Sequence, residues 1–305
     1  IRTSEFSKSL TISMLACLQR PTNAFIWISL GGFMILNLIS SGKYAQIFYL
    51  FKKLMVVFLV VFAINAAIDF YFYKEMVFPV FRFIKFNFTS SLSKFYGVAP
   101  WHFHLLQSLP ILLGYCLPFF VLGFATKLTS KRFVPWFKNP FFQFKFVIVT
   151  NMVVYSMISH KEFRFIYSLQ PFLLIISTFS LLGIMKKRYG DNTDVFISNS
   201  KLHVWIFPTL SVIIALILCT FNESGTVQVI NFLHQVPQID SLGFIMPCHS
   251  TPWQSHLHRN DINDLWAITC QPPLHLLNDP DAALKLPLYM DESDYLYEDV
   301  PKFIY

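Results

Sequence analysis

Four ionisable side chains stand within five residues of the segment SHKEFRFIYSLQP (159–171): His160, Lys161, Glu162 and Arg164. Apolar runs flank this segment on both sides. Lysine and arginine hold phosphate oxygens through charge-assisted hydrogen bonds, and a neighbouring carboxylate can pair with them and fix their orientation. We therefore interpret His160, Lys161 and Arg164 as an anion site for a phosphate, with Glu162 as the orienting residue. The alternative is a set of interfacial anchors without a ligand.

A second group of polar residues lies where one apolar run ends and the next begins. Asp69 follows the second run, where its carboxylate could cap the helix or face a cavity. His102 and His104 precede the third run and lie beside Trp101. An aromatic belt at the membrane surface is a sufficient explanation for Trp101. The two histidines and Asp69 are candidates for contacts with a polar ligand.

The C-terminal tail contains the segment PCHSTPWQSHLH (247–258), which is rich in cysteine and histidine. A zinc site is one interpretation, but the spacing matches no standard finger and the chain has no CxxC pair. On an oxidising side of a membrane, a disulfide between Cys248 and Cys270 is favoured. His249, next to two hydroxyl residues, could also bind a polar ligand. The sequence therefore predicts no metal site.

The composition predicts the elements that position these residues. Of the 305 residues 54% are hydrophobic and only 13% are charged, whereas a soluble protein has about 25% charged residues. A membrane helix needs about 20 predominantly apolar residues. The sequence therefore predicts an all-α polytopic membrane protein with about six transmembrane helices. The expected spans are Ala24–Ile39, Leu54–Ile68, Leu105–Ala125, Phe141–Ile158, Ile166–Met185 and Val204–Phe221.

Basic residues and glycosylation sequons together predict the orientation of the helices. The formal net charge of +7 comes with Lys and Arg in short blocks on alternate connections, which is typical of cytosolic loops and not of a nucleic-acid-binding surface. The sequons at Asn87 and Asn222 both fall on the opposite, luminal side, together with the segment 159–164. We expect a transmembrane region at 1–221 and a luminal domain at 222–305.

The tail after residue 221 has the pattern of a small α+β domain. GTVQVINFLHQV predicts an amphipathic helix, and SLGFIM and LWAITC predict short strands. The whole sequence lacks the GxGxxG, Walker A, GxSxG and HExxH motifs, which argues against a nucleotide-driven pump and familiar hydrolases. It opens with IRTSEFSKSL, without an initiator Met or an apolar signal region, so we expect the chain to start within a longer protein.

Four motifs resemble a known family. RPTNAFIW, DFYFYKEMVFPVFRFIKFN, FYGVAPWHFHLLQSLP and above all SHKEFRFIYSLQP are similar to the successive motifs of the dolichol-phosphate-mannose-dependent α-mannosyltransferases. These are multispanning GT-C enzymes of the endoplasmic reticulum, glycosyltransferase family 22. The tail motif GFIMPCHSTPWQSHLH resembles the fungal form of one branch, which acts on glycosylphosphatidylinositol (GPI) precursors.

The resemblance implies a specific reaction. That branch adds the third mannose of the GPI core, in α1,2 linkage, at the luminal face. The donor is dolichol-phosphate-mannose, the acceptor is the GPI precursor lipid, and the donor's β linkage becomes α, so the transfer inverts. Such a reaction needs a carboxylate base and cations that stabilise the leaving phosphate. No cofactor is implied, no metal requirement is indicated, and the sequence identifies no protein partner.

The resemblance also implies roles for the candidate residues. His160, Lys161 and Arg164 would bind the donor phosphate, and His102, His104 and His249 would contact the acceptor. Family members are considerably longer, and their first luminal loop, thought to carry the base, precedes anything seen here. We therefore expect the C-terminal half of such an enzyme, inactive by itself, with Asp69 as a secondary acidic residue.

Three alternatives remain at this point. One is a sister mannosyltransferase that acts on the lipid-linked oligosaccharide, which only the PCHSTP tail argues against. Another is a transporter, for which ionisable residues at helix centres and a paired repeat would be expected. Lys145 is the only clear intramembrane charge, near a cytosolic helix end, and no repeat is visible. The third is a non-catalytic luminal scaffold subunit.

Overall fold

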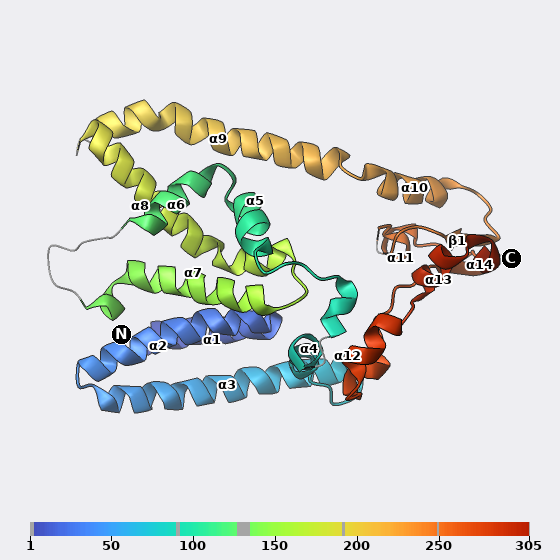
Figure 1. Ribbon diagram of the computed structural model, residues 1–305, viewed down its shortest axis with the longest axis horizontal. Coiled ribbons are helices and arrows are strands. Elements are labelled where there is room, and N and C mark those ends of the chain that lie inside the picture. The colour runs from blue at the N-terminus through green and yellow to red at the C-terminus, as the bar shows by residue number, and fades with distance from the viewer. Residues whose placement is uncertain (1–2, 90–91, 127–134, 191–192, 249, 305) are drawn as a thin grey trace. The chain divides into compact units, whose positions relative to one another are not determined.

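The computed structural model describes residues 3–89, 92–126, 135–190, 193–248 and 250–304 (Figure 1). The chain forms two compact units, residues 1–188 and 189–305. This division is based on contacts within the chain, and it places the long helix at residues 193–221 in the same unit as the tail. The predicted boundary between residues 221 and 222 has a different basis, the separation of membrane from lumen, and it stays a prediction.

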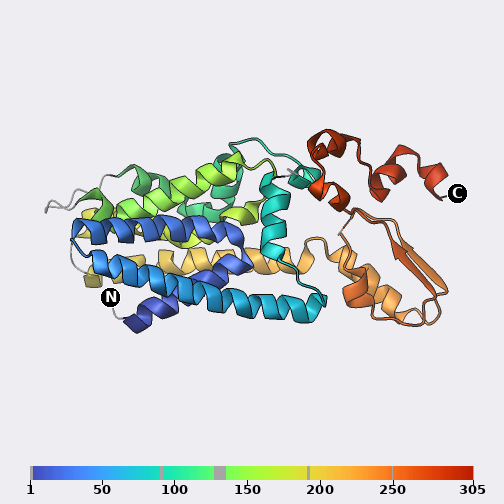
Figure 2. The same cartoon turned by 90° about the horizontal axis from the view of Figure 1, so that it is seen from below.

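Helices make up nearly all the regular structure of the first unit. They are α1 (Thr3–Gln19), α2 (Ala24–Ser40), α3 (Tyr44–Tyr73), α4 (Pro79–Ile84), α5 (Leu109–Leu113), α6 (Leu117–Ala125), α7 (Pro140–Met157) and α8 (Gln170–Tyr189). In the bundle α2 packs along α7, and α1 packs along α3. The short α4 runs crosswise to α3, so Figure 1 shows it end-on and Figure 2 from the side.

The core of the first unit is built from the middle helices. Tyr155 of α7, Ile166 in the turn before α8, and Leu173 and Ile176 of α8 are fully inaccessible. They pack with apolar residues of α2, α5 and α6. By contrast, α3 buries only Val61 along its 30 residues, which is the pattern of a helix that faces lipid. The bundle therefore has an inner pair of helices and an apolar outer layer.

Four helical stretches in the described residues are long and apolar enough to cross a membrane. They are Pro21–Ser40, Tyr44–Tyr73, His104–Ala125 and Phe163–Arg188. A fifth is obtained if Trp205–Phe221 and Ser224–Gln235, bent by 43° at their junction, count as one span. The fold class is confirmed: a polytopic helical membrane protein with a small α+β region. The predicted span at 141–158 is helical, as α7, but it is not among these stretches.

Polar side chains within α7 explain this difference. The helix contains Gln143, Lys145 and Asn151, and Asn151 is fully buried. Lys145 Nζ donates to the carbonyls of Phe124 at 2.5 Å and Thr126 at 2.8 Å. Carbonyls at the end of a helix such as α6 lack intrahelical partners. The lysine therefore satisfies the end of α6 and joins it to α7, which lies inside the bundle.

The second unit contains six helices and two strands among the described residues. They are α9 (Thr193–Phe221), α10 (Ser224–Gln235), β1 (Ser241–Phe244), α11 (Trp253–Leu257), β2 (Asp264–Ala267), α12 (Ala282–Lys285), α13 (Glu292–Glu298) and α14 (Val300–Ile304). The amphipathic helix and both strands expected in the tail are confirmed. The strands pair in parallel, with Ser241 opposite Asp264, and Ile230, Phe244 and Leu257 form the small core beneath them.

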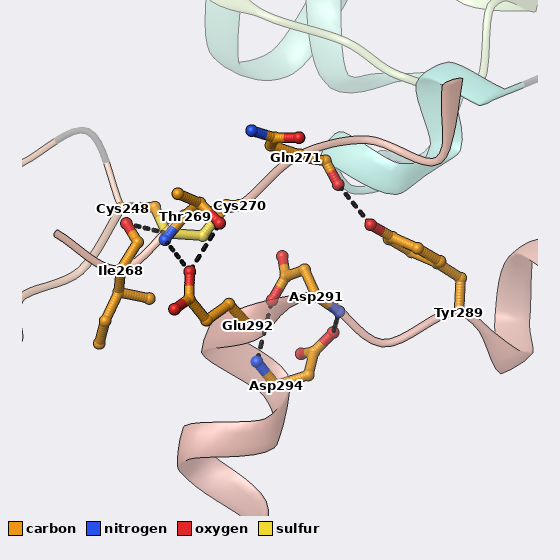
Figure 3. Close-up of a disulfide and its surroundings, with 9 residues drawn as sticks. All are labelled: Cys248, Ile268, Thr269, Cys270, Gln271, Tyr289, Asp291, Glu292 and Asp294. Atoms are coloured by element: carbon orange, nitrogen blue, oxygen red, sulfur yellow. Dashed lines mark hydrogen bonds between the residues drawn. A yellow bond between two sulfur atoms is a disulfide. The ribbon is translucent and has the colours of Figure 1, made fainter. Parts of the chain in front are cut away.

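A disulfide closes the segment between the strands (Figure 3). Cys248 follows β1 and Cys270 follows β2, and their Cα atoms lie 6.0 Å apart. Next to it, Glu292 accepts hydrogen bonds from the backbone N–H and the hydroxyl of Thr269 at 2.8 and 2.7 Å. Because Glu292 begins α13, which Asp291 caps, these bonds attach the C-terminal helices to the disulfide-linked strands.

Glycine at position 123 is required by close packing between α6 and α8. A Cβ there would lie 2.6 Å from the carbonyl oxygen of Ile176. We predict that Gly123→Ala pushes the two helices apart and destabilises the protein by about 1–3 kcal/mol, the usual range for overpacking. The measurement is the thermal midpoint of the intact protein in detergent.

The matched control is Gly183→Ala in α8, where a Cβ would meet no described atom within 4 Å. Because alanine is the better helix former by about 0.8–1.0 kcal/mol, this variant should keep or raise the midpoint. Equal losses in both variants would contradict the packing argument.

The disulfide predicts a distinctive pattern of free thiols. Denatured, unreduced protein is alkylated, and the modified cysteines are counted by mass. Cys248→Ser should show one more free thiol than the wild type because it releases Cys270. Cys219→Ser, which removes an exposed free cysteine, should show one fewer. A count that falls in Cys248→Ser would mean that Cys248 is not bonded.

Candidate functional site

The predicted anion cluster lines a cleft of about 1110 Å³ in the first unit. The cleft lies between the end of α1, the α4 segment and the turn between α7 and α8. Its lining residues include Tyr96 and, from these elements, Leu18, Arg20, Thr22, Pro79, Val80, Phe83, Phe86, Asn87, Ile158, His160, Lys161, Glu162, Arg164 and Phe165. All four ionisable residues of the cluster therefore meet one space.

Lys161 fixes the wall of the cleft. Its side chain is buried, with the residue only 8% exposed. Its ammonium donates to the carbonyl of Ala99 at 2.9 Å and to that of Ile158 at 2.5 Å. The backbone N–H of Ala99 in turn donates to the carbonyl of Ser159 at 3.1 Å. Lys161 thus attaches the loop around Ala99 to the end of α7, and its burial lowers the pKa of the ammonium.

Glu162 is the centre of the remaining cluster. Its carboxylate lies 3.0 Å from His160 Nε2 and accepts a bond from Arg164 Nη2 at 2.8 Å, with a second contact from Arg164 Nε. Partial burial favours the neutral acid, but the hydrogen bonds from His160 and Arg164 outweigh it and hold the pKa of Glu162 below its usual range. The carboxylate therefore orients both bases, as the sequence suggests.

His160 stands between two acceptors and two aromatic rings. Its Nδ1 lies 3.1 Å from the carbonyl of Gly97, while Nε2 faces Glu162. Each ring nitrogen therefore faces an acceptor oxygen. Tyr96 lies against it with ring centroids 5.8 Å apart, and Phe165 with centroids 5.9 Å apart. His160 is thus held in a single orientation at the cleft.

The cleft combines an excess of positive charge with an apolar wall. Arg20, Lys161 and Arg164 carry permanent or near-permanent charges, whereas Glu162 is the one carboxylate among the described lining residues. The apolar wall consists of Pro79, Val80 and Phe83 of α4 and of Phe86, which follows this helix. Such a surface suits a ligand with an anionic group and a hydrocarbon chain.

Comparison with known proteins identifies the family. The sequence pattern of the Alg9-like mannosyltransferase family matches residues 2–258. The chain belongs to this family. The resemblance drawn from the four motifs is therefore confirmed, and the alternatives outside the mannosyltransferases lose their support.

Relatives with curated names are similar over the whole chain. It is 54% identical to GPI mannosyltransferase 3 of Kluyveromyces lactis and 54% identical to that of Saccharomyces cerevisiae, in each case over all 305 residues. Identity to the protein of that name from Candida glabrata is 52%. The matches cover 51%, 49% and 48% of these three proteins, so the chain spans about half the length of the curated relatives it matches. No solved structure matches.

Other predicted residues of this family member lie away from the cleft. Asp69, near the end of α3, accepts a hydrogen bond from Asn65 Nδ2 at 2.7 Å. His104 is fully buried, with Nδ1 3.1 Å from Ser108 Oγ and its Nε2 without a partner among the described residues. Its neighbour His102 stacks edge-on with the Trp101 ring. None of these three candidates is part of the cleft lining.

The remaining candidates are distributed between the two units. His249 lies outside the described residues. Asn87 lines the cleft, where its Nδ2 donates to the carbonyl of Phe83 at 2.9 Å. Asn222 is exposed directly after α9. Use of either sequon stays a prediction. Within the described part of the chain, no three His, Cys, Asp or Glu residues are grouped as a metal site would need.

Arg20 is the cleft residue that sequence reasoning missed. It is the only charged residue in the motif RPTNAFIW, which carried part of the resemblance, and it lies four residues before the apolar run that begins at Ala24. Those two facts were the available signal. Its partners in the cleft come from residues about 140 positions further along the chain, and no local pattern shows such a distant contact.

The lowered pKa of Glu162 predicts a pH dependence of stability. A carboxyl whose pKa is depressed by folding contributes stability above the unfolded value, about 4.3, and loses it as the pH falls through the folded value. We therefore expect wild type to have a higher thermal midpoint than Glu162→Gln at pH 5–7, and the gap to close below about pH 4.

The measurement is the difference in midpoint between the two proteins across this range, in one detergent and at constant ionic strength. Glu5→Gln is the control, because Glu5 forms only an exposed pair with Lys8, and its curve should follow wild type throughout. A gap that stays constant as the pH falls well below 4 would show that Glu162 acts through packing and not through charge.

Proposed function

We propose that the intact protein transfers the third mannose, in α1,2 linkage, from dolichol-phosphate-mannose to the GPI precursor at the luminal face of the endoplasmic reticulum. The observation that carries the proposal is the cleft, in which the HKEFR cluster meets an apolar wall. It occurs in a chain of the Alg9-like mannosyltransferase family whose close relatives are named GPI mannosyltransferase 3.

The proposed reaction is a single displacement. The acceptor hydroxyl oxygen attacks the anomeric carbon of the mannose, and the bond from that carbon to the phosphate oxygen breaks. The dolichyl phosphate leaves with the electron pair, while a base takes the proton of the hydroxyl. Because negative charge develops on the departing phosphate, cations positioned there lower the barrier. This proposal needs no nucleotide site and no metal ion.

The cleft residues have different capacities for this task. Arg164 keeps an exposed guanidinium, with its side chain 67% accessible, and it is oriented by Glu162. Lys161 already donates to two carbonyls, so one N–H remains for a phosphate oxygen. We propose His160, Lys161 and Arg164 as donor contacts, with Arg164 the main one of the three.

We also propose roles for four candidate residues outside the described lining of the cleft. His102, His104 and His249 are candidates for contacts with the acceptor, and Asp69 is a secondary acidic candidate. Glu162 is already bonded to two bases, so we assign it to orientation and not to proton transfer.

Complementation tests the proposal directly. A fungal strain that lacks third-mannose transfer receives the intact protein, either wild type or with Arg164→Ala or His160→Ala. We expect wild type to restore three-mannose GPI precursors and both variants to accumulate two-mannose precursors. Lys8→Ala is the control, because this lysine is exposed and outside the cleft, and it should complement fully.

The analysis of lipid intermediates separates the alternatives. Normal three-mannose precursors in both cleft variants would exclude the phosphate role of the cluster. Failure of wild type to restore the precursors, together with repair of a strain defective in lipid-linked oligosaccharide, would instead indicate the sister activity.

A further inference from the structure

We infer that Arg20 is the principal contact for a lipid-linked phosphodiester in this cleft, and that the ligand is the sugar donor. The inference rests on the proposed function, since it names the residue that recognises the donor's phosphate. The observation behind it is that the basic residues of the cleft differ in whether their hydrogen-bond donors already have partners.

Three of the four bases in the cleft already have partners. Lys161 is buried and directs its ammonium to the carbonyls of Ala99 and Ile158. Arg164 and His160 both bond Glu162. A phosphate must compete with these contacts or use what they leave free. The charges of this cluster are thus largely compensated before a ligand arrives.

Arg20 differs from the other three bases. Within the described residues its guanidinium has no hydrogen bond and no ion pair. Its contact is with the ring of Phe165, whose centroid lies 5.9 Å from the guanidinium carbon. A ring provides no acceptor oxygen, so this contact leaves the five N–H donors of the guanidinium available for a ligand. Phe165 also packs against His160, so Arg20 is positioned next to the cluster.

The backbone presents Arg20 in a fixed position. Its own N–H donates to the carbonyl of Ala16 at 3.0 Å, at the end of α1. Its backbone is extended, at φ −147° and ψ 95°, as is usual for a residue before proline, here Pro21. Asn23 Nδ2 also donates to the Ala16 carbonyl, at 3.0 Å. The turn is thus defined from both sides, which lowers the entropic cost of binding.

The chemistry of the site defines the ligand class. A planar guanidinium fits two phosphate oxygens at once, and the α4 wall of proline, valine and phenylalanine suits a hydrocarbon chain. A lipid phosphodiester satisfies both. Donor and acceptor of the proposed reaction each contain one, since the GPI precursor is a phosphatidylinositol. We assign the site to the donor because the cation excess of the same cleft suits a phosphate that gains charge as it leaves.

The test compares binding of two probes to the intact protein in detergent. They are a short polyprenyl phosphate and the polyprenol of the same chain length, with wild type, Arg20→Gln and Arg20→Lys. We expect wild type to prefer the phosphate and Arg20→Gln to lose about 10- to 100-fold of that preference, as for loss of a charge-assisted contact. Arg20→Lys keeps the positive charge but lacks the planar guanidinium that fits two phosphate oxygens, so it should lose less of the preference.

Arg82→Gln is the matched control, since Arg82 is an exposed arginine of α4 that is not part of the cleft lining. It should behave as wild type. Steady-state kinetics then separate the two lipids: Arg20→Gln should raise the KM for the donor about 10-fold or more and leave the KM for the acceptor unchanged.

Each outcome decides a different point. If Arg20→Gln prefers the phosphate as strongly as wild type does, this inference is overturned and the proposed function stays intact. No preference in wild type defeats the phosphate site of the proposed function itself. A raised KM for the acceptor alone reassigns Arg20 to the other lipid and contradicts the inference. If Arg20→Gln does not fold, Arg20→Lys with the same probes gives the answer.

Discussion

The cleft depends on the burial of one cation, the ammonium of Lys161. A buried charge needs partners, and here they are the carbonyls of Ile158, after the end of α7, and of Ala99 in a distant loop. Lys161 thereby holds the turn between α7 and α8 against the loop around Ala99. Its neighbours His160 and Glu162 are held at the cleft by the same attachment. The anion site is thus a consequence of where its most buried member points.

The second condition for the site is a balance of charge. Cations close together repel, and their repulsion is strong where water is excluded. Glu162 reduces it by bonding His160 and Arg164, while the aromatic face of Phe165 accommodates Arg20 without neutralising it. The cleft therefore remains positive without being an open cluster of like charges. A carboxylate and a ring have different effects here: the first fixes the bases, and the second leaves one available.

Sequence patterns predicted the local elements well and the distant contacts poorly. The amphipathic helix α10, both strands and the charged turn at 159–164 follow from residue types and periodicity over short windows. The inward direction of Lys161 and the role of Arg20 do not, because each depends on a partner far along the chain. The prediction of a simple span at residues 141–158 did not account for Lys145, because this residue finds its partners, carbonyls at the end of α6, only once the helices pack.

The parallel pairing of β1 and β2 has a consequence for biosynthesis. Parallel strands cannot be joined by a tight turn, so the chain from residue 245 to residue 263 must cross over before Ser241 can meet Asp264. Such non-local pairing forms slowly, because the entropic cost of closing the loop comes before the contacts between the strands can stabilise it. The tail can complete its fold only after residue 270 has left the ribosome and met an oxidising compartment. Completion of the tail thus depends on synthesis of both strands and on oxidation of both cysteines.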